Sequence, residues 1–445
     1  MTHKIGMISL GCAKNQVNSE NMLAALDQAG FEIISGPDGA DAVIINTCGF
    51  IESARSEAYY VIGEVKKLKV ENKVGKIIVA GCLPERYKSL LDDIPEIDAV
   101  LGCGSYHRIV GVVRGVLSGR KAAVFDDPDT APIDGSRILS TPGYTAYIKI
   151  AEGCDNRCSY CVIPSLRGRY RSRRMEDILE EAKGLAGLGV RELIVIAQDT
   201  SRYGIDLYGK RRLGELLERL CRIDGLRWIR VHYLYPDEID EGLIRVFADE
   251  EKIVKYLDIP IQHASDRILK AMNRRGDGKY LDNLFARLRD KIPGAVFRTS
   301  VIVGFPGETR EDFEELCAFL KKHKFVRGGV FKYSAEKGSP AERMDGQVDE
   351  DEKERRYELA CALQSRIIDE YNRSLISGKL TVLCEGFDSD IGYYFGRTFA
   401  DSPEVDARIY FRAPFDVSPG MLLAVMAVRE ADGELYGEAV DITEV

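Results

Sequence analysis

Short apolar runs alternate with amphipathic, charged stretches along most of the chain. In the first third the apolar runs lie at 4–9, 42–45, 76–80 and 98–101. A helical pattern follows each run, and the first of these helices is expected over about 19–30. Continuously apolar strands separated by helices are typical of a parallel sheet that is covered on both faces. The pattern therefore predicts a parallel α/β domain over residues 3–119.

The same alternation resumes after 120–143, a stretch with Asp and Pro that predicts a linker. Strands are expected at 145–150, 191–197, 226–231, 255–259, 296–302 and 328–333. Helices are expected at 174–188, 213–222, 237–248, 265–290 and 309–322, with a charged amphipathic helix at 349–374. Six β/α units over 140–372 predict a partial barrel, whose active site would lie at the carboxyl ends of its strands.

From residue 375 the pattern changes to short strands separated by Gly, Pro and Asp, at 379–385, 393–398, 407–411, 422–428 and 435–440. Five such strands over 375–443 predict a small β-barrel of the OB-like type, a fold that often binds RNA. From 375 to the last residue, 445, the chain contains five Lys and Arg against thirteen Asp and Glu, a net charge of −8. We expect such a module to repel phosphates and attract a basic protein, although the carboxylates could also form only a soluble surface.

The composition is that of an ordinary globular protein, with 445 residues, 45% hydrophobic and 30% charged, and a net charge of −9. No segment resembles a secretory signal or approaches the length of a membrane span, so we expect a cytoplasmic protein without a membrane partner. Eleven cysteines, an odd number, then favour metal chemistry over disulfides.

Cys154, Cys158 and Cys161 have the spacing C-x3-C-x2-C in the loop after the first central strand, with the aromatic Tyr160 just before the last of them. Zinc usually requires a fourth protein ligand, and no nearby Cys or His supplies one. Three thiolates suit an iron–sulfur cluster in which one iron is left open to another ligand. The alternative is a small zinc loop or reduced structural thiols.

Cys12, Cys48 and Cys82 each follow one of the first three strands. Because the carboxyl ends of parallel strands meet at one edge of a sheet, these cysteines should converge into a second three-cysteine site. Inert core cysteines are the alternative. Cys103 follows the fourth strand and is either a fourth ligand or a buried bystander.

Polar residues also follow the central strands, among them Gln198, Asp199, Thr200, His232, Tyr233, Gln262 and His263. The turn at 303–309 contains glycines that would let a ligand such as an adenosine approach the backbone closely. Five arginines lie within 167–174 and could hold carboxylates or phosphates, or could form a solvated turn with one or two functional members.

The C-x3-C-x2-C loop resembles the signature of the radical S-adenosylmethionine (SAM) superfamily. Together with the second cysteine set and the terminal barrel, nearly the whole chain resembles the methylthiotransferases of that superfamily. The resemblance implies an α/β protein with an N-terminal Rossmann-like domain, a central partial (βα)6 barrel and a C-terminal OB-like barrel of the TRAM type.

The resemblance also implies two [4Fe-4S] clusters and SAM as cofactors. One cluster would bind SAM and be held by Cys154, Cys158 and Cys161. The auxiliary cluster would be held by Cys12, Cys48 and Cys82; Cys103 is not among the ligands of the family. We expect SAM contacts from Tyr160, Arg171, Gln198, Gly304 and Glu308, and substrate contacts from Asn15 and His263. No side chain is expected to act as a general acid or base, because the clusters and SAM carry the chemistry.

The run 9–15, Ser-Leu-Gly-Cys-Ala-Lys-Asn, resembles the branch of the family that adds a methylthio group to the β-carbon of an aspartate in small-subunit ribosomal protein S-twelve. The runs 198–201 and 262–265 favour the same branch. The predicted protein is thus a transferase whose substrate is this ribosomal protein, free or in the small subunit. Its further partners would be a reducing electron donor and a sulfur donor. The alternative is methylthiolation of an adenosine next to the tRNA anticodon, with tRNA as the partner; a non-catalytic iron–sulfur sensor or adaptor is the less expected third hypothesis.

Overall fold

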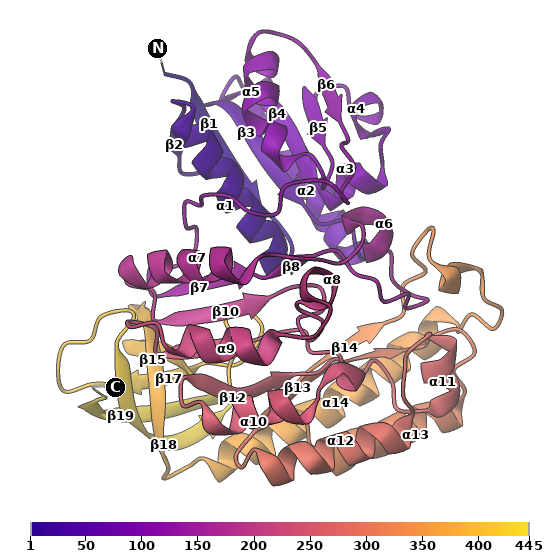
Figure 1. Ribbon diagram of the computed structural model, residues 1–445, viewed down its shortest axis with the longest axis vertical. Helices are drawn as coiled ribbons and strands as arrows, with labels where there is room; N and C mark the ends of the chain where they lie inside the picture. Colours follow the sequence, from indigo (N-terminus) through magenta and orange to yellow (C-terminus); the bar gives the residue numbers. More distant parts are fainter. Residues whose placement is uncertain (1, 444–445) are drawn as a thin grey trace.

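The computed structural model describes residues 2–443 and contains three principal sheets (Figure 1). The first sheet is parallel throughout, with the strand order β2-β1-β3-β4-β5-β6. Its strands are β1 (Lys4–Ser9), β2 (Glu32–Ile34), β3 (Ala40–Thr47), β4 (Val74–Gly81), β5 (Ala99–Leu101) and β6 (Ala122–Val124). Its helices are α1 (Ala13–Gln28), α2 (Glu52–Val70), α3 (Cys82–Arg86), α4 (Leu90–Asp93) and α5 (Ile109–Leu117), with a 3-10 turn at Tyr106–Arg108.

The predicted parallel α/β arrangement is confirmed, with three local differences. Helix α1 begins at Ala13, directly after Cys12, and not near residue 19. Strands β2 and β6 were not predicted, because three residues are too few to show a period. Strand β6 pairs with β5, so the first sheet extends into the segment 120–143 that was expected to be a linker.

The central sheet is also parallel, in the order β14-β13-β12-β11-β10-β7, as expected for a partial (βα)6 barrel. Its strands are β7 (Thr145–Lys149), β10 (Glu192–Ile196), β11 (Trp228–Val231), β12 (Ile253–Asp258), β13 (Val296–Val303) and β14 (Arg327–Lys332). Its longer helices are α7 (Met175–Gly187), α9 (Leu213–Cys221), α10 (Glu241–Asp249), α12 (Gly278–Lys291), α13 (Arg310–His323) and α14 (Glu350–Ser374). Shorter elements are β8 (Ala151–Glu152), α6 (Ile163–Arg167), β9 (Arg171–Ser172), α8 (Ile205–Tyr208), α11 (Asp266–Ala271) and 3-10 turns at Pro236–Glu238 and Pro340–Arg343.

The single helix predicted over 265–290 is in fact two helices, α11 and α12. Between them Asn273 and Gly276 have φ values of +55° and +87°, which a helix cannot accommodate. Asp277 then caps α12 by accepting a hydrogen bond from the backbone N–H of Tyr280 at 2.7 Å. The break matters for function because the end of α11 packs on the cysteine loop described below.

The C-terminal module is a closed five-stranded barrel in the order β15-β16-β17-β19-β18, which confirms the predicted OB-like fold. Its strands are β15 (Lys379–Asp388), β16 (Tyr393–Thr398), β17 (Ile409–Arg412), β18 (Leu422–Ala431) and β19 (Glu434–Ile442). The barrel lies beside the central domain, at the end away from the N-terminal domain (Figure 1).

Buried ion pairs hold the barrel on the central sheet. Glu192 of β10 accepts hydrogen bonds from Arg397 at 2.6 Å and from Arg230 at 2.9 Å, and all three side chains are at most 1% exposed. The Asp401 carboxylate pairs with the buried Arg327 of β14. A loop of the barrel therefore supplies charges that side chains inside the partial barrel require.

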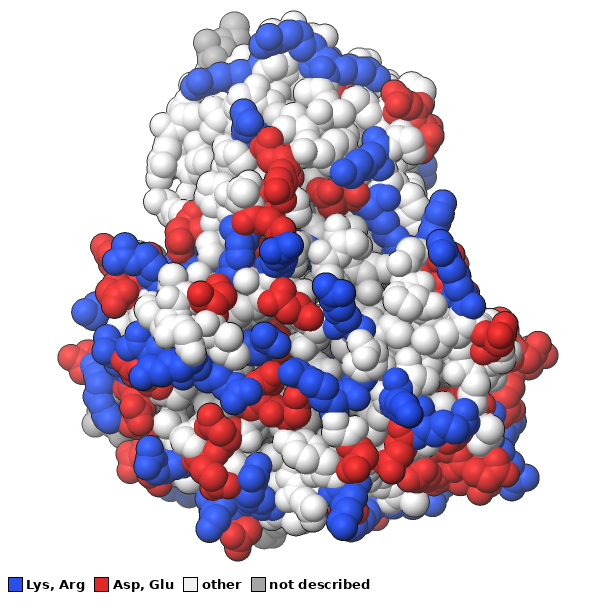
Figure 2. All heavy atoms as spheres, turned by 45° about the vertical axis from the view of Figure 1, so that its right-hand side comes forward, with Lys and Arg blue, Asp and Glu red and all other residues white. Residues whose placement is uncertain are grey.

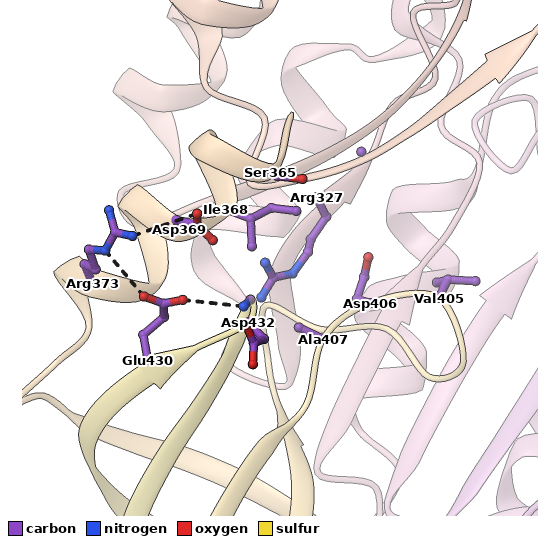
Figure 3. A pocket seen from close by; sticks show the side chains of 12 residues that line it. Arg327, Ser365, Ile368, Asp369, Arg373, Val405, Asp406, Ala407, Glu430 and Asp432 are labelled. Carbon is purple, nitrogen blue, oxygen red and sulfur yellow. Dashed lines mark hydrogen bonds and ion pairs between the residues drawn. The ribbon is translucent and has the colours of Figure 1, made fainter. Parts of the chain in front are cut away.

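A further junction lies between the barrel, α14 and β14, where a cavity of about 620 Å³ is open at the surface (Figure 3). On one side of it Arg373 lies between Asp369 and Glu430, at 3.9 and 3.4 Å.

Both signs of charge also alternate over the face of the central domain in Figure 2.

The acidic side chains of the barrel are partly used inside the protein, which modifies the expectation of an acidic docking surface. Seven of the thirteen accept hydrogen bonds or ion pairs from other described residues: Glu385, Asp388, Asp401, Asp406, Glu430, Glu434 and Asp441. Glu444 lies outside the described residues. Within residues 2–443, no helix combines the length and the apolarity that crossing a membrane requires.

We expect Glu192→Gln to loosen the barrel from the central domain, because it leaves two arginines buried without their carboxylate. Although burial by itself would raise the pKa of Glu192, Arg397 and Arg230 lower it to about 2. Breaking one side of such a buried pair costs about 3–5 kcal/mol. Urea unfolding at pH 7 measures this loss.

The carboxylate stabilises the folded state above its unfolded pKa of about 4.3, and this contribution disappears as the pH falls toward 2. The difference between wild type and Glu192→Gln should therefore shrink below pH 4. Glu370→Gln is the control, since Glu370 forms an exposed pair with Lys324 and its loss should change the stability little. Equal effects of both substitutions at pH 7 would contradict the role given to Glu192.

Candidate active site

The cysteine loop of the central domain lies between β8 and α6, past the carboxyl end of β7. Cys158 is buried, Cys154 and Cys161 are partly buried, and none of the three forms a disulfide. Burial raises the pKa of the Cys154 thiol to about 12, and the Cys161 pKa is raised by burial and by the neighbouring Cys158 and Cys154 thiolates. Burial is the largest influence on both thiols.

Hydrogen bonds fix the loop on the rim of the sheet. Asn156 Nδ2 donates to Asp199 Oδ2 at 2.7 Å, and Ser159 Oγ donates to the carbonyl of Ala271, the last residue of α11, at 2.8 Å. Gly153 has a φ of +77°, and a Cβ there would lie 1.9 Å from the carbonyl oxygen of Arg169. The loop thus requires glycine just before its first cysteine.

Cys12, Cys48 and Cys82 follow β1, β3 and β4, and the structure brings them to one edge of the first sheet. The pKa of Cys48 is raised to about 12, first by burial and then by the Cys82 and Cys12 thiolates. Gly11 has a φ of +88°, and a Cβ there would lie 2.6 Å from Cys48 Cβ. The close packing of Gly11 on Cys48 therefore positions two of the three thiols.

Cys103 contacts this second set through one sulfur atom. Its thiol donates to Cys82 Sγ at 3.7 Å, and its backbone N–H donates to Glu85 Oε2 at 3.0 Å. The hydrogen bond from Cys103 is the largest influence on the Cys82 thiol and lowers its pKa; burial opposes the shift and Arg167 supports it. Cys103 is thus a hydrogen-bonding neighbour of a candidate ligand.

The second cysteine set lies at the junction between the first two domains, next to the segment that follows the cysteine loop. Cys82 and Cys103 share an apolar cluster with Val162 and Leu166, and Val162 directly follows Cys161. Arg167, at the end of α6, donates to Cys82 Sγ at 3.4 Å. Helix α6 is visible at this junction in Figure 1.

Each set has a donor chemistry that fits a [4Fe-4S] cluster. Within residues 2–443, no three His, Cys, Asp or Glu side chains are arranged to hold a single metal ion. A cluster does not require that convergence, because each thiolate binds a different iron atom.

A buried carboxylate, Glu152, connects the two domains at this site. Its oxygens accept from Lys149 Nζ at 2.7 Å, Gln198 Nε2 at 2.6 Å and Arg167 Nη1 at 3.2 Å. Lys149 also donates to Asn18 of α1 at 2.6 Å. Burial alone would raise the Glu152 pKa, but Lys149 and Arg167 lower it, so the carboxylate is ionised.

The sequence analysis missed this role of Glu152. The available signal was the presence of Lys149 and Glu152 in an otherwise apolar strand, where an unpaired charge would be costly.

The five residues expected to contact SAM are not all free to do so. Arg171 donates to the carbonyl oxygens of Ala131 at 2.6 Å and Pro128 at 2.5 Å, in the segment before β7. Gln198 donates to Glu152, while its Oε1 is buried and, among the described residues, has no hydrogen-bond partner. Gln198 thus presents an unsatisfied acceptor beside the cysteine loop.

The other three residues of this group lie in packed surroundings. Tyr160 packs against an apolar cluster that includes Phe305. Gly304 has a φ of +72° and approaches Lys353 of α14, where a Cβ would lie 2.3 Å from Lys353 Cγ. Glu308 is fully buried and accepts from Arg356 Nη1 at 2.7 Å. The missing side chain of Gly304 thus lets the backbone approach Lys353 of the same chain, and not a ligand.

The two residues expected to contact substrate are both fully buried. Asn15 donates to the carbonyl of Thr47 at 2.9 Å, and its Oδ1 accepts from Arg167. His263 Nδ1 accepts from the backbone N–H of Ser265 at 3.0 Å, and its Nε2 lies 3.5 Å from Glu308 Oε2. Asn15 is thus engaged inside the protein, whereas His263 Nε2 is buried and has no hydrogen-bond partner among the described residues.

Lys14, in the first turn of α1, crosses the junction and lies over the ring of Tyr233, with Nζ 3.5 Å from the ring centroid. Tyr233 follows β11 and has a φ of +63°, a conformation that costs free energy for a residue with a side chain. Gln262, after β12, has a φ of +70°. Such strain clusters at functional sites, and both residues lie on the rim where the sequence predicted the active site.

Comparisons with known proteins agree with this architecture. Residues 148–320 match the Radical SAM superfamily, residues 4–102 match Uncharacterized protein family UPF0004, and residues 377–440 match the TRAM domain. Among solved structures, the chain is similar to the radical S-adenosylmethionine methyltransferase TsrM from Kitasatospora setae with cobalamin and a [4Fe-4S] cluster bound. That similarity has a TM-score of 0.56 and 14% identity and covers 75% of each chain, so it concerns the fold alone.

Relatives of similar length are much closer in sequence. The chain is 48% identical to the ribosomal protein uS12 methylthiotransferase RimO of Pelotomaculum thermopropionicum, covering 98% of this chain and 99% of the relative. It is 47% identical to the protein of the same name from Desulforamulus reducens, with 98% and 99% covered. The chain therefore belongs to the family of the ribosomal protein uS12 methylthiotransferases RimO.

Proposed function

We propose that this protein is a radical SAM transferase that adds a methylthio group to the β-carbon of an aspartate in ribosomal protein uS12. The observation that carries the proposal is the presence of two three-cysteine sets at one domain junction. The relatives named for this activity extend over the whole chain, which includes both sets and the terminal barrel.

Cys154, Cys158 and Cys161 would hold one [4Fe-4S] cluster, and the auxiliary cluster would lie on the second set: Cys12, Cys48 and Cys82. When bound, the clusters and SAM supply radical hydrogen abstraction at an unactivated carbon and the sulfur group to be transferred. Glu152 and Arg167 fix the position of one cysteine set relative to the other, because their hydrogen bonds connect the loop, α6 and α1. The unsatisfied Oε1 of Gln198 would accept a hydrogen bond from a donor group of SAM.

The division into three domains over 3–119, 140–372 and 375–443 remains part of the proposal, as do the partners. The reaction requires a reducing electron donor and a sulfur donor, and we place it in the cytoplasm with the ribosomal protein or the small subunit. Part of the negative charge of the barrel is internal, so its electrostatic attraction to a basic protein is weaker than the net charge of −8 suggests. The choice of substrate therefore rests on the motifs and the named relatives.

Mass spectrometry of candidate substrates tests the activity. We expect the reconstituted protein, given SAM, reductant and sulfide under anaerobic conditions, to add one methylthio group to an aspartate of uS12 and none to an anticodon stem-loop. A mass gain on the RNA alone would replace the assignment by tRNA modification. The absence of 5′-deoxyadenosine under the same conditions would favour a non-catalytic adaptor.

The iron content tests the two cluster sites separately. We expect the combined change of Cys154, Cys158 and Cys161 to Ala to leave about half of the bound iron, because each cluster depends on its own thiolates. Cys103→Ala serves as the matched control and should leave the iron content near wild type. Loss of all iron from the triple variant, or a large loss from Cys103→Ala, would contradict this assignment of ligands.

Gly11→Ala tests how the backbone positions the second set. The new methyl group would overlap Cys48, so we expect fewer auxiliary-cluster irons and a stability loss of about 1–3 kcal/mol from backbone strain. Gly30→Ala provides the control, because Gly30 has a φ of +85° but nothing within 4 Å of an added Cβ. It should lose stability without losing iron. Equal iron loss in the two variants would contradict the packing argument.

A further inference from the structure

Lys14 is a buried cation at the junction between the first two domains. Its side chain is 9% exposed, and it follows the candidate ligand Cys12 by two positions on the first turn of α1. Lys14 contacts the ring of Tyr233, which lies just past the carboxyl end of β11 in the central domain. Lys14 therefore reaches from the side of the second cysteine set to the rim of the central domain.

Lys14 has no carboxylate partner within the described part of the chain. The ion pairs there occupy the other buried cations nearby: Lys149 and Arg167 both pair with Glu152. None of the ion pairs among the described residues involves Lys14. A cation–π contact offsets only part of the cost of removing an ammonium group from water. Lys14 is thus charged and largely desolvated, and no carboxylate among the described residues pairs with it.

We propose that Lys14 binds the carboxylate of the substrate aspartate and so determines that an acidic side chain is modified. The proposal rests on the function given above and extends it to a specific residue. An aspartate whose β-carbon must lie between the two cysteine sets brings its carboxylate into the same space. A lysine presents three N–H donors on a flexible stem, and Tyr233 restricts where that stem can point.

The geometry favours a carboxylate over a phosphate. Lys14 is one compact charge with no arginine fork beside it, because Arg167 is already engaged by Glu152, Asn15 and Cys82. Phosphate groups are usually held by several cationic or backbone donors together. Lys14 would act as a substrate-binding residue, with no proton transfer assigned to it.

The test measures binding of the holoenzyme to uS12 and to a uS12 variant in which the modified aspartate is replaced by asparagine. Wild type should bind the aspartate form about 10- to 100-fold more tightly, the range for a hydrogen bond to a charged group. Lys14→Met keeps the apolar stem and removes the charge, so it should bind both forms equally and weakly. Lys14→Arg should retain part of the preference.

Lys121→Met is the control, because Lys121 is an exposed lysine of the same domain that donates to the carbonyl of Pro95. It should bind and discriminate like wild type. Iron content and SAM cleavage without substrate are measured in parallel for every variant, and binding is compared between preparations of equal iron content. These two readouts separate a loss of substrate binding from damage to the clusters.

Two results would overturn the proposal. One is a Lys14→Met protein in which the ratio of the affinities for the aspartate and asparagine forms equals that of wild type, whether or not both affinities fall. The other is loss of auxiliary-cluster iron in both Lys14→Met and Lys14→Gln, which would assign the charge to the cluster. Wild type that neither binds nor modifies uS12 would instead refute the proposed function itself.

Discussion

The ionised carboxylate of Glu152 is the interaction on which the site depends. A buried carboxylate is stable only when cations and hydrogen-bond donors surround it, and Lys149, Arg167 and Gln198 fill that role. Since Lys149 and Arg167 also bind side chains of α1, the same charge holds the first domain against the second. The relative position of the two cysteine sets follows from this one buried group.

The same principle is used at the other end of the central domain. Glu192 lies within β10 and is neutralised by Arg230 from the neighbouring strand and by Arg397 from the barrel. The partial barrel leaves its interior open, and the C-terminal module fills part of that opening with charged side chains. Buried ion pairs therefore attach the barrel firmly to the central domain, and its acidic composition reflects internal pairing as well as surface charge.

The rim of the central sheet, with the strained residues Tyr233 and Gln262, lies between the buried charges around Glu152 and those around Glu192. Tyr233 is held in its left-handed conformation because its N–H donates to Asp258 at 3.1 Å and its carbonyl accepts from Thr200. This strain places the Tyr233 ring under Lys14. A cation at the domain junction, a strained rim and two thiol sets thus share one space, which is the arrangement that a substrate side chain between two clusters would require.

The sequence by itself determined the three sheets, nearly all their long strands and helices, and both cysteine sets, because apolar periodicity and local spacing are properties of neighbouring residues. It could not place α1 directly after Cys12 or divide the helix after His263, since both depend on turn conformations that tertiary packing selects. Only the tertiary structure decided which polar side chains are free. Asn15 and Glu308 are polar and follow strand ends, yet their partners come from Thr47 and Arg356, distant in sequence, so no local pattern could reveal that they are already engaged.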